Sequence, residues 1–100
     1  MIAYKLLRLR KNGLLSPLFI NKKQIIPLNK WLKAEPHLTK GFAFRPGWHC
    51  TNSCNAPHLK MEGRIWCEVE IKNFKELKRP ASQGGMWYLS NWMRVKKIIN

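Results

Sequence analysis

Acidic residues are scarce in this chain, and aspartate is absent. The 100 residues include 19 Lys and Arg against five acids, all of them glutamates, which gives a formal net charge of +14 at pH 7. An excess of this size indicates an acidic partner, most often nucleic acid. The alternative is a genome bias that enriches Lys, Asn and Ile. Because the basic residues are spread along the chain, the sequence alone defines no single basic patch.

Long apolar runs are missing as well. No segment approaches the roughly 20 apolar residues that a membrane-spanning helix needs, and the N-terminal residues lack the pattern of a signal peptide. Cysteine occurs only three times, an odd count that does not suit a disulfide framework. We therefore expect a cytoplasmic protein that is neither secreted nor inserted in a membrane.

The chain does contain enough apolar residues for one small domain. Hydrophobic residues make up 45% of the sequence and aromatic residues 11%. Apolar and polar side chains alternate over residues 64–71, which predicts a strand with one buried side. Residues 2–10 alternate in part and form a first predicted strand, and residues 14–20 form a second one, in which Pro17 indicates an edge strand or a break. The Asn12-Gly13 turn between them predicts a hairpin.

A short helix is expected next. Residues 28–35 follow a short strand at 24–27, and they have Asn29 in a capping position. In such a helix, Trp31 and Leu32 would face the core.

The remaining segments complete the expected fold. Residues 37–64 form a long irregular passage rich in turn-forming residues. Residues 72–80 can form a helical turn, and residues 86–100 fit a helix or a closing strand. We predict an α+β fold for residues 1–100: a small single domain with a curled antiparallel sheet, one or two short helices and a long irregular central loop.

Residues 47–60, which read GWHCTNSCNAPHLK, contain candidate metal ligands. Cys50, Cys54 and His58, with Cys67 from the following strand, would give zinc three sulfur ligands and one nitrogen ligand. However, the alternation of the following strand turns Cys67 toward its apolar side, where a free cysteine behaves as a small hydrophobe. A zinc site and a set of unlinked thiols are both open.

Candidate catalytic residues come from the same region. His49 and His58 could act with Glu68 and Glu70, or with a neighbouring cysteine as a thiolate–imidazole pair. The two glutamates are two residues apart on one predicted strand, so they point the same way and could orient ribose hydroxyls. The plainer interpretation is a solvated strand face that nearby lysines balance.

Five tryptophans accompany the basic residues. Indoles near Lys and Arg can stack on nucleobases while the cations hold phosphates, although tryptophans also fill cores and line protein interfaces. The Pro46-Gly47 turn would present an arginine and a tryptophan together. The candidate ligand-binding or nucleic-acid-binding residues are Arg8, Arg10, Arg45, Trp48, Arg64 and Trp66.

Three short motifs support a family resemblance: RPGWH at residues 45–49, APH at 56–58 and WCEVE at 66–70. The run from residue 4 to residue 71 that contains them resembles a family of small uncharacterised proteins of tailed phages, notably gut phages. Related segments occur inside large polyvalent proteins of phages and mobile elements. The resemblance implies a phage or mobile-element origin and brings no defined activity, and it implies no cysteine at the position of Cys54.

Small basic phage proteins often act on the nucleic-acid machinery or the defences of the host, including CRISPR systems. We therefore expect an accessory protein of the host cytoplasm that binds nucleic acid, or an acidic host protein or nucleoprotein defence complex, without a cofactor. An enzyme alternative is an NAD-dependent ADP-ribosyltransferase, which the chain faintly resembles through Arg8, Arg10 and the Glu68-x-Glu70 strand. It lacks the Ser-Thr-Ser strand of such enzymes. A small zinc-binding module is the third alternative.

Overall fold

The computed structural model describes residues 1–18, 24–34 and 47–99. Within these ranges the chain is a small, mostly β domain whose strands form one antiparallel sheet, with a single 3-10 turn and no α-helix. The elements are β1 (Ile2–Leu9), β2 (Leu15–Ser16), β3 (Leu32–Lys33), β4 (Trp48–Thr51), β5 (Arg64–Lys78), η1 (Ala81–Gln83) and β6 (Met86–Ile98).

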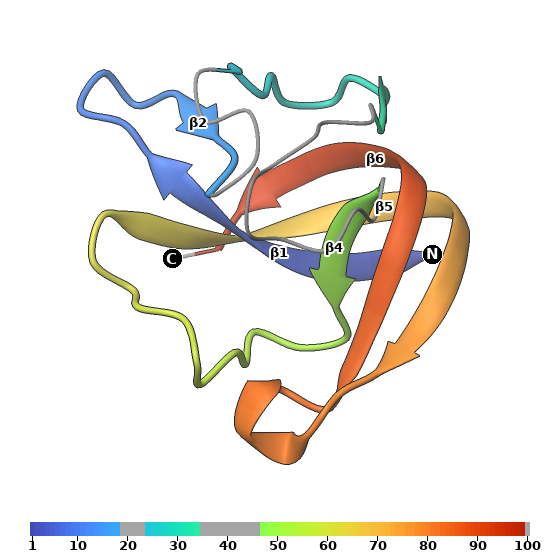
Figure 1. Cartoon of the computed structure of the whole chain (residues 1–100). Helices are drawn as coiled ribbons and strands as arrows, with labels where there is room; N and C mark the ends of the chain where they lie inside the picture. The colour runs from blue at the N-terminus through green and yellow to red at the C-terminus, as the bar shows by residue number, and fades with distance from the viewer. Residues whose placement is uncertain (19–23, 35–46, 100) are drawn as a thin grey trace.

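The sheet closes on itself. β1 pairs with both β4 and β5, and β6 pairs with the same two strands, so these four strands form a ring of antiparallel pairs. β2 extends the ring from β1, and β3 extends it from β6. Figure 1 shows β5 and β6 as a long bent hairpin with η1 at its tip. The predicted antiparallel sheet is therefore confirmed.

The interior of the ring holds the core. The alternation predicted over residues 64–71 is confirmed, because Cys67, Val69 and Ile71 are buried and Ile65 packs partly buried against the same core. The buried cluster comprises Ala3, Leu7, Leu15, Ile26, Trp48, Cys50, Cys67, Val69, Ile71, Met93 and Val95.

The β5–β6 hairpin bends sharply at one corner. Asn73 has a φ of 55°, a left-handed conformation that asparagine tolerates. Ile71 before the bend and Phe74 after it both pack in the core, so the two-residue alternation slips by one residue here. On β6 the Ser90 hydroxyl lies 3.0 Å from the carbonyl oxygen of Lys72 and 2.6 Å from that of Trp92. A buried hydroxyl thus ties the two strands together at the bend.

The expected helices do not form in the described residues. Leu28 bridges to Val95, and β3 pairs with β6, so the predicted helix at 28–35 is an extended segment along β6 as far as residue 34. Asn29 does not cap a helix; its φ of 60° is left-handed, and its N–H donates to the Val95 carbonyl at 2.8 Å. Pairing with an open edge of β6 outweighs the helical pattern of the segment.

The second predicted helical turn is also wrong. Residues 72–78 continue β5 and pair with β6 as far as Met86. The same pairing resolves the ambiguity of residues 86–100, since residues 86–98 form a strand. The turn at Asn12-Gly13 is confirmed, with Gly13 at a φ of 83° between β1 and β2.

Candidate nucleic-acid interface

The outer surface of β3, β6 and β5 carries an alternation of indoles and cations. Met93 and Val95 of β6 point into the core, so Trp92 and Arg94, which alternate with them along the strand, face outward. Trp92 lies between two lysines, because Lys33 pairs with it from β3 and Lys72 pairs with it from β5.

Trp31, directly before β3, completes this surface. The ammonium of Lys72 lies 4.3 Å from the ring centroid of Trp31 and 5.3 Å from that of Trp92. The guanidinium carbon of Arg94 lies 4.9 Å from the Trp31 centroid. Cations and indoles therefore alternate in space as well as along the strands. We call these five residues, Trp31, Lys33, Lys72, Trp92 and Arg94, the indole face.

One acid borders the indole face. Arg94 donates a hydrogen bond from Nη2 to Oε1 of Glu70, its partner on β5. The two side chains are 28% and 32% exposed, so water still reaches the pair. The hydrogen bond from Arg94 lowers the pKa of the Glu70 carboxyl below its usual value. Glu70 is thus held ionised beside Arg94.

This arrangement suits a flexible polyanion with flat bases. Indoles can stack on bases of any sequence, and lysine and arginine neutralise phosphates. Lys33 and Lys72 are exposed, whereas Trp31, Trp92 and Arg94 are half-buried. The cation–π contacts place the charges of Lys72 and Arg94 before any ligand arrives, which lowers the entropy cost of binding.

The sequence predicted little of this surface. It placed Trp31 on the core side of a helix and left the conformation of the Trp92 segment open. The available signal was the alternation of residues 92–95, in which Trp and Arg occupy one side and Met and Val the other. Reading that segment as a strand would have put the indole and the guanidinium on the solvent side.

The candidate Trp48 belongs to the core. It is only 9% exposed, and its indole N–H donates to the carbonyl oxygen of Leu32 at 3.1 Å. The contact supports β3, so Trp48 has a structural role next to the indole face. The candidate Arg45 lies outside the described residues.

The other predicted arginines gather at the opposite end of β5. Arg8 of β1 pairs directly with Arg64 of β5. An open depression beside them is lined by Arg8, Leu9, Arg10, Lys11, Asn12, Glu62 and Gly63. Trp66 lies on the same outer side of β5 as Arg64 and is half-buried. The structure therefore brings Arg8, Arg10 and Arg64 together, as a second basic region.

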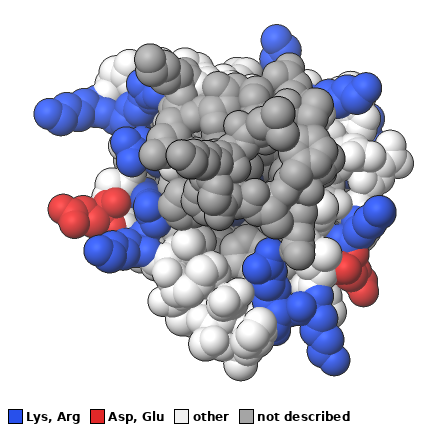
Figure 2. All heavy atoms as spheres, in the orientation of Figure 1, with Lys and Arg blue, Asp and Glu red and all other residues white. Residues whose placement is uncertain are grey.

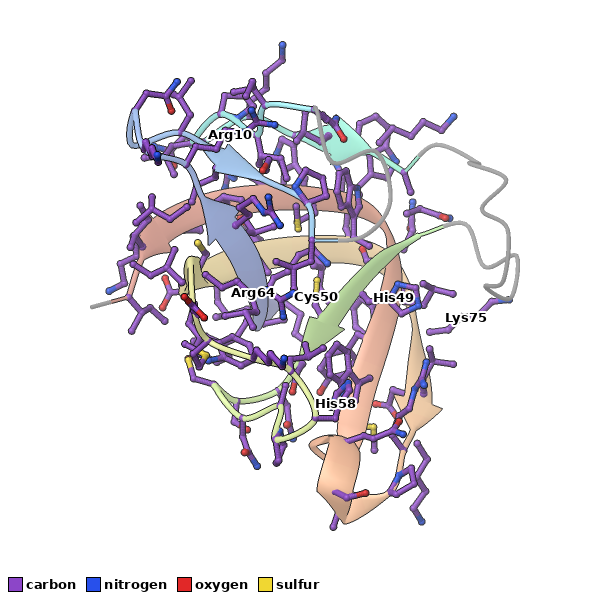
Figure 3. The ribbon with its side chains drawn as sticks, turned by 60° about the vertical axis from the view of Figure 1, so that its left-hand side comes forward. Arg10, His49, Cys50, His58, Arg64 and Lys75 are labelled. Atoms are coloured by element: carbon purple, nitrogen blue, oxygen red, sulfur yellow. The ribbon has the colours of Figure 1, made fainter. Side chains whose placement is uncertain are left out.

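The four candidate catalytic residues are distributed over three segments. His49 lies on β4, and His58 follows in the β4–β5 connection with its ring 5.8 Å from that of Trp87, edge to face. Glu68 and Glu70 share the outer side of β5, and Glu70 is bonded to Arg94. Figure 3 shows His49 on the outer side of β4 and Cys50 within the barrel. His58 and Glu70 therefore both have structural contacts.

The candidate zinc ligands divide between core and surface. Cys50 and Cys67 are fully buried, whereas Cys54 and His58 are exposed. Burial raises the pKa of both inner thiols to about 11, which disfavours the thiolate that zinc requires. Residues 1–18, 24–34 and 47–99 contain no group of three or more His, Cys, Asp or Glu residues that could hold a metal.

Lys5 points into the ring, unlike the other basic residues described above. Its ammonium donates to the carbonyl oxygen of His49 at 2.6 Å and lies 6.0 Å from the Trp48 ring. Burial lowers the pKa of Lys5, while the neighbouring thiols of Cys50 and Cys67 oppose that shift. Lys5 is placed to join β1 to β4 and not to contact a polyanion.

Other basic side chains lie around the edge of one face of the molecule. Figure 2 shows Lys and Arg around the periphery of one face, where they outnumber the acidic side chains.

No helix in the described part of the chain is long and apolar enough to cross a membrane. No family model, curated protein or solved structure matches this chain.

Proposed function

We propose that the chain binds single-stranded nucleic acid on the indole face. The observation that carries this proposal is the alternation of Lys72 on β5, Trp92 and Arg94 on β6, and Trp31 just before β3, with 4.3–5.3 Å between cation and ring centroid. Bases stack on the exposed parts of the indoles, and phosphates contact the cations. The net charge of +14 adds long-range attraction for any polyanion.

A single strand fits this surface better than a duplex does. The bases of a duplex are stacked on each other, so an indole on a sheet surface has no base face to contact. A single strand exposes its bases and is flexible enough to follow a curved sheet. We therefore expect DNA and RNA single strands to bind more tightly than duplexes of the same length at equal salt.

The test measures the affinity of labelled oligothymidine by fluorescence anisotropy over a range of salt. Trp92→Leu removes one stacking partner and should weaken binding by roughly 5- to 150-fold, because each stacked base contributes ~1–3 kcal/mol. Lys72→Gln should weaken binding and flatten the salt dependence by about 0.7 in the log–log slope, as expected for one lost phosphate contact on a single strand.

The matched control for the second variant is Lys78→Gln. Lys78 is exposed on the same strand, beyond the corner at Asn73, so the substitution changes the same charge away from the indole face. Equal losses for Lys72→Gln and Lys78→Gln would refute a defined site and leave only the net charge. Salt-independent binding, or no binding to any DNA or RNA, would refute the proposed function.

The phage origin that the sequence resemblance implies would place the ligand in an infected host. A host nucleoprotein complex, such as a CRISPR effector, presents single-stranded nucleic acid of the same chemistry. Under this proposal the chain acts as a competitor for that strand. Binding to a purified effector that the Trp92→Leu substitution leaves unchanged would instead indicate a protein partner.

A further inference from the structure

The outer side of β5 links the indole face to the arginines at the other end of the strand. Alternation along β5 is unbroken from residue 64 to residue 72, since Cys67, Val69 and Ile71 all face the core. Five outer side chains therefore follow one another along this strand: Arg64, Trp66, Glu68, Glu70 and Lys72.

The arginine end is unusually basic. Arg8 and Arg64 are directly opposite on paired strands, an arrangement in which like charges repel. Arg64 is positioned by a hydrogen bond from Nη1 to the Lys60 carbonyl oxygen at 3.0 Å. The adjacent depression adds the side chains of Arg10 and Lys11, with Glu62 as the one acid in its lining. A bound anion would relieve the repulsion between the two arginines.

In the middle of this row of outer side chains, each acid is paired with a cation. Glu70 is bonded to Arg94, and Glu68 pairs with Lys97 of β6. Neither acid offers a phosphate contact, and each lies next to a cation. Trp66, between Glu68 and Arg64, adds one more half-buried indole along the same side. The outer side of β5 thus has a basic region at each end and an indole on the way.

We infer that the cluster of Arg8, Arg10, Lys11 and Arg64 is a second phosphate-binding site for the same single strand. A strand held on the indole face continues along β5, past Trp66, to this cluster. This inference rests on the proposed function. The nine residues from Arg64 to Lys72 span at most ~26 Å, at about 3.3 Å for each of the eight steps between them. For comparison, an OB fold, another small β domain, holds ~4–16 nucleotides of a single strand.

If the arginine cluster is a second site, affinity should rise with oligonucleotide length, and this rise should require the arginines. Oligothymidines of 4, 8 and 16 nucleotides are titrated against the wild-type chain and the double variant Arg8→Gln/Arg64→Gln. The wild type should bind the 16-mer at least tenfold more tightly than the 4-mer. The double variant should bind the 4-mer like the wild type, while its affinity for the 16-mer falls about tenfold.

The control is Lys75→Gln/Lys78→Gln, which removes two exposed charges from β5 beyond the corner. It should keep most of the gain from 4-mer to 16-mer. Unfolding temperatures of all variants are compared first, because Arg8→Gln/Arg64→Gln removes a like-charge pair but also the hydrogen bond from Arg64 to the Lys60 carbonyl oxygen.

The possible outcomes distinguish a failure of the second site from a failure of the proposed function. Full 16-mer affinity in the arginine variant would overturn the second site while the indole face stands. Equal losses in the arginine and lysine variants would overturn it too, because net charge alone would then set the length dependence. Failure of every length to bind the wild type would overturn the proposed function and this inference together.

Discussion

At the scale of single residues, Glu70 determines how much of the charge on the indole face is available. Its carboxylate is bonded to the Arg94 guanidinium, which lies over Trp31. An incoming phosphate must compete with that carboxylate. Under the proposed function, Glu70 would lower the affinity for a polyanion, and its bond holds Arg94 in place over Trp31.

The substitution Glu70→Gln should tighten the binding of a single strand several-fold and steepen its salt dependence. The amide is nearly isosteric with the carboxylate but carries no charge, so Arg94 becomes free to contact a phosphate. Glu76→Gln makes the same charge change on the exposed part of β5 past the corner and is the control. Equal gains in the two variants would show that Arg94 is not released by the change.

The same pair predicts how stability depends on pH. The folded-state pKa of Glu70 is lowered by Arg94, so the unfolded state takes up a proton first as the pH falls. The contribution of the pair to stability is present above the ordinary glutamate pKa of about 4.3 and is lost on acidification through the lowered value. Thermal unfolding from pH 7 to pH 3 should show a smaller decrease for Glu70→Gln than for the wild type.

The three cysteines should differ in reactivity. Cys54 is exposed, whereas Cys50 and Cys67 lie inside the ring with pKa values raised to about 11. Because the thiolate is the reactive form, an aromatic disulfide reagent at pH 8 should modify one thiol per native chain quickly and all three after denaturation. Loss of the fast phase in Cys54→Ser identifies the thiol. Fast reaction of three thiols in the native chain would contradict the buried positions.

At the scale of elements, the bend in the β5–β6 hairpin sets the orientation of the indole face. The Ser90 hydroxyl contacts the carbonyl oxygens of Lys72 and Trp92, and these two residues carry one of the cations and one of the indoles. The indole face and the bend are therefore joined by one buried side chain, Ser90.

Ser90→Ala should destabilise the fold by about 1–2 kcal/mol, because it removes a buried hydroxyl that can donate to either of two carbonyl oxygens and that accepts from the Trp92 N–H. In a domain of this size, that corresponds to a decrease in unfolding temperature of roughly 4–16 °C. Ser82→Ala makes the same change at an exposed position of η1 and should have little effect. Similar unfolding temperatures for the wild type and Ser90→Ala would show that the hydroxyl does not stabilise the bend.

The elements differed in how well their sequence predicted them. Residues 64–71 were predicted correctly because one face is buried and the alternation is regular. The continuation to residue 78 was missed because Asn73 interrupts the alternation at the bend. The segment at 28–34 has a helical pattern, but a left-handed Asn29 and pairing with β6 make it extended. Both failures come from long-range pairing, which local patterns do not encode.

At the scale of the whole molecule, the positive charge predicts a class of ligand without locating its site. The sequence predicted that indoles and cations would act together, and it named Trp66, Arg8, Arg10 and Arg64, which all lie along or beside the outer side of β5. It could not separate surface tryptophans from core ones. That distinction depends on how the ring closes, which places Trp48 inside and Trp92 outside.

The seam between β1 and β4 differs from the rest of the ring. These strands share a single residue pair, Tyr4 with Thr51, and the Lys5 ammonium bonds the His49 carbonyl beside it. By contrast, β5 and β6 pair over most of their length, and β3 joins the indole face to β6. If the ring opens first at this seam, the surface that holds the two outer indoles stays assembled. A substitution at Lys5 is therefore expected to loosen the closure of the ring while the indole face keeps its arrangement.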